Sequence, residues 1–173
     1  MMPINFDPDE WAREIMAAAV LTHKQKSVMT EFNGDESELS HWPACLYYCQ
    51  LDPKCRPERF RIGVSVLLAK RLSQMRTNCP EAKILWAYGY GYGCEDRVRH
   101  ELKTNCSLNV RHVGRDVFET FSHDALKKHI EVFIADLIKN DPSLLESGKK
   151  AEELWEKRAI QKYRDRMLTL QPS

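Results

Sequence analysis

The sequence predicts a helix-rich α+β protein, with five or more helices around a small antiparallel sheet of two or three strands. Apolar residues recur at helical spacing in several segments, most clearly over residues 123–138. Two other segments, residues 83–92 and 109–121, alternate between apolar and polar side chains as strands do. A chain of 173 residues with 43% apolar side chains can bury one core, so we expect a single globular domain over residues 1–173.

The first part of the chain is expected to hold two helices. Residues 7–10, Asp-Pro-Asp-Glu, have the pattern of a helix start, with an N-cap acid, an early proline and further acids in the first turn. Asn33-Gly34 should end this helix, and a polar, acidic connector follows. A short second helix is expected over residues 43–51, because Pro53 disfavours helical backbone in the residue before it.

The middle of the chain is expected to contain one long helix and then the strands. Pro57 opens the helix, which should run to residue 77. Its apolar side chains form a stripe: Phe60, Val64, Leu67, Leu68, Leu72 and Met75. A strand over residues 83–92, a short helix over 95–104 and a bent or hairpin strand over 109–121 should follow.

Two amphipathic helices should complete the fold. Ser122 precedes the first and has the side chain of a helix N-cap, and Pro142 marks the break after it. The last helix, over residues 149–169, is highly charged and carries Leu154 and Trp155 in a narrow apolar stripe. Such a helix is a candidate docking element, or the contact of a homodimer.

Composition limits the classes of function. The net charge is +1, so no global field points to nucleic acid or a membrane surface. No run of 18 apolar residues occurs, and the acidic N-terminal segment is unlike a signal or transit peptide. Six cysteines without a secretory signal are typical of reduced thiols, so we expect a cytoplasmic protein without membrane partners.

Residues 86–93 alternate tyrosine and glycine before a charged segment. A phosphate-binding loop is disfavoured, because the spacing is not G-x-G-x-x-G and Glu95 and Asp96 would repel a phosphate. On a strand the aromatic side chains share one face: Trp86, Tyr88, Tyr90 and Tyr92. If exposed, they would stack on bases at ~1–3 kcal/mol each. The favoured interpretation is that they belong to the core and that the glycines let a helix approach closely.

No motif predicts an enzyme. The sequence lacks a G-x-S-x-G elbow and a recognisable cysteine-protease signature. The residues His41, Cys45, Cys49 and Cys55 are weak metal candidates, because they lack the paired C-x₂₋₄-C spacing of structural zinc sites. We therefore expect no cofactor and no metal.

The clearest electrostatic feature is a basic stretch over residues 54–76, expected to be largely helical. Seven bases in this stretch face one acid, Glu58. We expect a small non-enzymatic interaction or regulatory protein that acts through protein–protein contacts. The alternative is a nucleic-acid-binding protein, or one with an acidic partner, that uses the basic stretch and the strand over residues 86–92. The residues of that alternative are Lys54, Arg56, Arg59, Arg61, Lys70, Arg71, Tyr88, Tyr90 and Tyr92.

Overall fold

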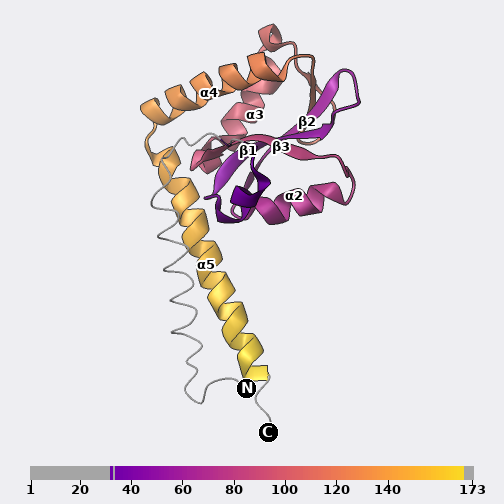
Figure 1. Cartoon of the computed structure of the whole chain (residues 1–173). Helices are drawn as coiled ribbons and strands as arrows, with labels where there is room; N and C mark the ends of the chain where they lie inside the picture. The colour runs from indigo at the N-terminus through magenta and orange to yellow at the C-terminus, as the bar shows by residue number, and fades with distance from the viewer. Residues whose placement is uncertain (1–31, 33, 170–173) are drawn as a thin grey trace.

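A computed structural model describes residue 32 and residues 34–169 of the chain (Figure 1). The helix expected to begin at residues 7–10 lies outside the described residues. Phe32 is buried and meets the ring of Trp42 edge-on, with ring centroids 5.8 Å apart. This contact ties the start of the described chain to the body of the protein.

The centre of the fold is a five-stranded sheet in which all neighbouring strands are antiparallel. Its order is β3-β1-β2-β5-β4. The strands are β1 (Cys45–Asp52), β2 (Glu58–Ser65), β3 (Lys83–Gly89), β4 (Arg111–His112) and β5 (Val117–Thr120). The expected sheet of two or three strands is therefore wrong, because β1 and β2 lie in segments that we predict as helices.

β1 replaces the helix expected over residues 43–51. Leu46 and Tyr48 face one hydrophobic core, Tyr47 and Cys49 face another, and all four are fully buried. A central strand that is covered on both faces can be apolar at every position. It then lacks the alternation that identifies a half-buried strand, and a short apolar run of this kind is easily taken for a buried helix.

β2 occupies the first part of the helix expected over residues 57–77. Phe60, Ile62 and Val64 face a hydrophobic core, and arginines alternate with them. Phe60 and Val64 are also four residues apart, so the same side chains satisfy a helical stripe. Antiparallel pairing with β1, from Cys45–Ser65 to Asp52–Arg59, decides between the two structures.

Four α-helices lie within the described residues, fewer than the five or more expected for the whole chain. They are α2 (Leu68–Arg76), α3 (Glu95–Thr104), α4 (His123–Asn140) and α5 (Ser143–Thr169). Short 3₁₀ segments are η1 (Glu36–His41), η2 (Gly91–Cys94) and η3 (Cys106–Leu108). The predicted N-cap of α4 is confirmed, because the Ser122 hydroxyl accepts a hydrogen bond from the Ala125 amide.

The helices cover the sheet on both faces (Figure 1). α3, α4 and the start of α5 enclose one core, to which Val98, Ile130 and Leu144 contribute. α2 and η1 enclose the other, to which Leu72 and Leu39 contribute. α5 then extends away from the sheet and ends at a distance from it (Figure 1).

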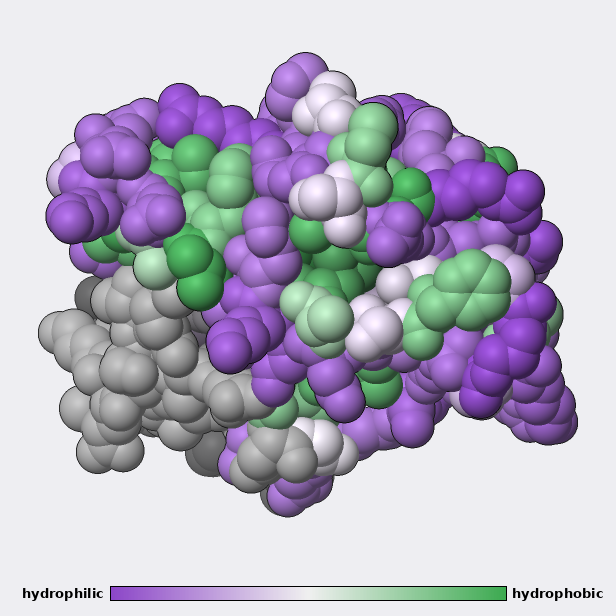
Figure 2. Space-filling model, turned by 90° about the horizontal axis from the view of Figure 1, so that it is seen from above, coloured by the Kyte–Doolittle hydropathy of each residue, from purple (hydrophilic) through white to green (hydrophobic). Residues whose placement is uncertain are grey.

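The surface is mostly polar. Seen from the end where α4 lies, the hydrophobic side chains form separate patches among charged and polar ones (Figure 2). Within the described residues, every helix is too short or too polar to cross a membrane.

Candidate functional site

The basic stretch is not one helix. Lys54 and Arg56 lie in the turn after β1, Arg59 and Arg61 lie on β2, and Lys70 and Arg71 lie on α2. A single helix over residues 54–76 would align these charges along one axis. In the structure they are divided among a turn, a strand and a helix. The expectation that this stretch is largely helical is therefore wrong.

Arg59 belongs to a row of charges that crosses three strands. Its partner across the sheet is Glu119 on β5, and Glu119 in turn pairs with Arg111 on β4. Arg59 Nε lies 3.1 Å and Arg111 Nε 2.9 Å from the Glu119 carboxylate. The carboxylate is 4% exposed, while the side chains of Arg59 and Arg111 are 55% and 74% exposed. Two exposed guanidinium groups thus share one buried acid, which leaves this row with a net positive charge.

Arg61 belongs to a second cluster of charges, next to the first residue of β5. Its guanidinium pairs with Asp116, and Arg99 of α3 lies 3.8 Å from the same carboxylate. Arg99 also binds Glu95 at 2.6 Å, one helical turn earlier on α3. Burial raises the pKa of Glu95, with Arg99 opposing the shift. These arginines are therefore largely neutralised within the protein.

Arg71 reaches the sheet from α2. Its Nε donates to the Tyr47 hydroxyl at 3.1 Å. The Tyr47 ring lies over Gly63 of β2, where a Cβ would come within 2.6 Å of the hydroxyl. Gly63 thus provides the space that lets Tyr47 reach Arg71. Arg71 and Tyr47 have a clear structural role here, joining α2 to the sheet.

The tyrosines of the glycine-rich stretch do not share a face. β3 ends at Gly89, and Tyr90 has left-handed backbone with φ +58° before η2 begins. Tyr88 is only 4% exposed and packs at 4.9 Å on Trp86 inside the core. The strand expected to continue to residue 92 is therefore wrong, and Tyr88 is unavailable for stacking on a base in the folded protein. Tyr90 and Tyr92 are half-buried.

The metal candidates are distributed over η1, β1 and the following turn. Among the described residues, no group of three or more His, Cys, Asp or Glu side chains is placed to hold a metal ion. The side chain of His41 lies outside what the structure describes. Burial raises the pKa of Cys45, and raises that of Cys49 to about 12. These thiols are therefore protonated near neutral pH and are poor nucleophiles.

A polar network at the start of α4 escaped prediction. The Tyr48 hydroxyl hydrogen-bonds to Nδ1 of His123, and Nε2 of His123 lies 2.5 Å from Glu58. Gln50 donates to the same Glu58 carboxylate at 2.5 Å. Burial, with the Glu58 charge adding to it, raises the pKa of Tyr48, so the phenol stays protonated. The residues of this network come from β1, β2 and α4, so no local spacing in the sequence predicts the network.

These groups face one another rather than a cavity. Nε2 of His123 is shielded from solvent, and the Tyr48 ring stacks on Phe60 at 4.4 Å. The network therefore fixes the start of α4 to the β1–β2 hairpin. An acid–base role would require access to a substrate, which the closed geometry does not offer.

The first turns of α5 are anchored by close packing. Gly148 approaches Tyr90 closely, since a Cβ would lie 3.2 Å from its Cα atom. Gly93 of η2 meets Leu144 and Ser147 at similarly short range. The Glu152 carboxylate accepts a hydrogen bond from the Ala44 amide at 2.5 Å. The predicted close approach of a helix to the glycines is thus seen at Gly93, where the partner is α5.

Beyond this anchor, α5 presents apolar side chains to solvent. Leu154 is 50% exposed and Trp155 is 40% exposed. Both residues follow Glu152 on α5, after the turns that are anchored to the body of the protein. Two large apolar side chains in neighbouring positions of a projecting helix form the clearest exposed apolar feature of α5.

Comparison with known protein families, curated proteins and solved structures finds no match to this chain. The inference of function therefore rests on the side chains and surfaces of this protein.

Proposed function

We propose that this chain is a non-enzymatic interaction protein that binds a protein partner through the projecting part of α5. The observation that carries the proposal is the exposure of Leu154 and Trp155 on a helix whose first turns are fixed to the body. A fixed helix start restricts the orientation of the projecting part, so less freedom is lost when a partner binds. A helix with large apolar side chains on one side suits a helix-in-groove contact.

The neighbouring charges indicate the chemistry of the partner. Lys150 and Arg158 lie four residues on either side of Leu154, and Lys162 lies seven residues after Trp155. At these spacings they share the side of the helix that carries the two apolar residues, and all three are exposed. The proposed partner surface is an apolar groove with acidic residues on its rim. A second copy of this chain is one candidate for it.

The chemistry of the interior favours binding over catalysis. The His123 ring is held between Tyr48 and Glu58, and the buried thiols of Cys45 and Cys49 have raised pKa values. Neither arrangement presents an activated nucleophile at the surface. This supports a protein that acts through its surfaces.

The test compares Leu154→Ala/Trp155→Ala with the matched variant Glu153→Ala, which changes an exposed side chain on another side of the helix. Alanine preserves helix propensity, so thermal unfolding of both variants should resemble that of the wild type. Proximity cross-linking in the native cell extract and sedimentation velocity should show contacts or self-association that the double variant loses and Glu153→Ala keeps. Identical contacts and mass for all three proteins would contradict the proposal.

A second candidate function is binding of a polyanion such as single-stranded nucleic acid. The observation that favours it is the charge row of β2, β5 and β4, where Arg59 and Arg111 are both exposed and share one acid. Anisotropy of a labelled oligonucleotide across a salt series tests it. Replacing Arg59 and Arg111 by glutamine should reduce the slope of log affinity against log salt by about one unit for each lost phosphate contact. Absence of binding at low salt would remove this candidate.

A further inference from the structure

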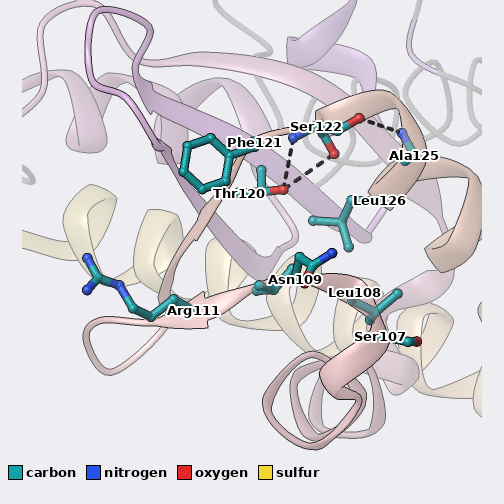
Figure 3. Close-up of a pocket in the computed structure, with 10 residues that line it drawn as sticks. Ser107, Leu108, Asn109, Arg111, Thr120, Phe121, Ser122, Ala125 and Leu126 are labelled. Atoms are coloured by element: carbon teal, nitrogen blue, oxygen red, sulfur yellow. Dashed lines mark hydrogen bonds between the residues drawn. The ribbon is translucent and has the colours of Figure 1, made fainter.

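A cavity of about 540 Å³ lies between the chain entering β4 and the connection from β5 to α4 (Figure 3). Residues of both segments form its walls: Ser107, Leu108, Asn109, Val110, Arg111, Thr120, Phe121, Ser122, Ala125 and Leu126. Its volume is within the range of small-molecule sites. Neither the proposed α5 contact nor the Tyr48 network uses it.

Hydrogen bonds hold the α4 side of the cavity in shape. The Ser122 amide donates to the Thr120 hydroxyl at 3.2 Å, and the Ala125 amide donates to the Ser122 hydroxyl at 3.4 Å (Figure 3). Ser122 thus lines the cavity while its hydroxyl oxygen caps α4. A wall fixed in this way needs little rearrangement to bind a ligand.

Phe121 is the most exposed large apolar side chain of the described residues, at 81%. It stands at the cavity, between Thr120 and Ser122, both of which are held by hydrogen bonds. An aromatic ring left in water beside a preformed cavity offers a face on which a planar group can stack. Leu108 and Leu126 supply apolar surface to the same cavity (Figure 3).

Asn109 lies across the cavity from Phe121 (Figure 3). Within the described part of the chain, its side-chain amide has no hydrogen-bond partner. An amide offers a donor and an acceptor side by side, the pair that matches the edge of a nucleobase. The cavity therefore combines the aromatic face of Phe121 with the Asn109 amide, which can hydrogen-bond to the edge of a planar ring.

Arg111 could bind a phosphate at this cavity, because it is one of the lining residues (Figure 3) and its Nε, 2.9 Å from Glu119, engages only part of the guanidinium. Of the five N–H groups of an arginine, two bind Glu119 here, so three remain for an anion. None of the ten lining residues is acidic. Glu119 is bound by two arginines, and Asp124 in the first turn of α4 does not line the cavity.

We propose that this cavity binds a nucleotide, with the base against Phe121 and Asn109 and the phosphate at Arg111. The shared chemistry is a planar base linked to a phosphate, whether as a free mononucleotide or as one unit of a single strand. The site does not depend on the function proposed for α5, since it lies on β4, β5 and the start of α4, and it shares only Arg111 with the charge row of the second candidate function.

The first experiment titrates ¹⁵N-labelled protein with the four ribonucleoside 5′-monophosphates and with the matching nucleosides. We expect at least one monophosphate to shift the amides of residues 107–111 and 120–126, and its nucleoside to bind about tenfold more weakly without the charged contact. Failure of all four monophosphates to shift these residues would overturn the proposal. Equal affinity of nucleoside and monophosphate would also overturn it, because the phosphate contact would be absent.

A pair of variants at Ser122 separates binding from folding. Both Ser122→Asp and Ser122→Asn keep an N-cap side chain for α4, so both should melt close to the wild type. The aspartate places a negative charge at the cavity and should abolish monophosphate binding, whereas the asparagine should retain it. Loss of binding in both variants, or in neither, would contradict the assignment.

Phe121→Ala tests the stacking face, and its high exposure means that the fold should tolerate it. The affinity for the monophosphate should fall about tenfold or more if the base stacks on this ring. An unchanged affinity would overturn the assignment. A labelled hexanucleotide distinguishes the two sources: tighter binding than the monophosphate, lost in Phe121→Ala, assigns the site to a strand, and equal affinity assigns it to a free nucleotide.

Discussion

The two faces of the sheet differ in how completely they are covered. On one face, Phe60 of β2 and Phe118 of β5 are fully buried under the layer that contains α3 and α4. On the other, α2 and η1 cover mainly β1 and β3, and β2 and β5 place Arg59 and Glu119 in ion pairs. On β2 and β5, therefore, the face under the helices is packed with apolar side chains, and the opposite face, which α2 and η1 do not cover, carries ion pairs.

The largest effect that tests this comparison is expected from Phe60→Ala. Phe60 stacks between Tyr48 and Phe118, with ring centroids 4.4 and 5.5 Å away, so its loss leaves a cavity. The free energy of unfolding should fall by about 3–5 kcal/mol, measured by urea denaturation. Arg59→Ala changes the neighbouring residue, which lies on the face where ion pairs replace apolar packing (the open face), and should lower the free energy of unfolding much less. Equal losses of stability in the two variants would show that the two faces contribute equally to stability.

An intermediate effect is expected where α2 meets the sheet. Gly63→Ala would push a methyl group against Tyr47, whose hydroxyl binds Arg71, and should destabilise the protein by about 1–3 kcal/mol. Tyr47→Phe removes the nearest clashing atom, so the double variant should lose less than the sum of the two single variants. Urea midpoints of the four proteins measure this coupling, and strict additivity would argue against the contact.

The smallest effect is expected from pH on the open face. Hydrogen bonds from Arg111, with Arg59 adding to them, hold the pKa of Glu119 below its ordinary value of 4.5. A carboxyl group with a lowered pKa in the folded state stabilises the fold above its unfolded pKa, and this contribution disappears as the pH falls through the folded pKa. Unfolding midpoints between about pH 6 and pH 3 should therefore fall less steeply in Glu119→Gln than in the wild type. Identical acid sensitivity would contradict the pairing.

The sequence predicts helices well where their ends carry local signals. Ser122 caps α4 as expected, and α3 begins at Glu95 as predicted. α5 begins at Ser143, before the predicted residue 149, because Gly148 packs against Tyr90 inside the helix and does not precede it. Glycine is read as a helix breaker from sequence, but at a close contact between elements it can be required within a helix.

It is harder to predict β1, β2 and the candidate site, because the contacts that decide them join residues far apart in the sequence. Cys45 and Cys49 are four residues apart, which suits a helix face, yet on β1 both are buried against the α2 side of the sheet. The sequence indicates Arg59 and Arg61 as candidates, but their partners Glu119 and Asp116 lie more than 50 residues away in the chain. The nucleotide cavity, too, joins two segments whose separate sequences contain no motif.

By itself the sequence determined the helix-rich α+β character, the capped start of α4, the basic stretch and the apolar stripe of the last helix. Capping, amphipathic spacing and charge act over a few residues, so they can be read from the chain directly. Only the tertiary structure decided that residues 45–52 and 58–65 are strands, that Tyr88 is core and that Phe121 stands beside a cavity. Those outcomes depend on pairing and burial between distant segments, whose free energy outweighs local preference.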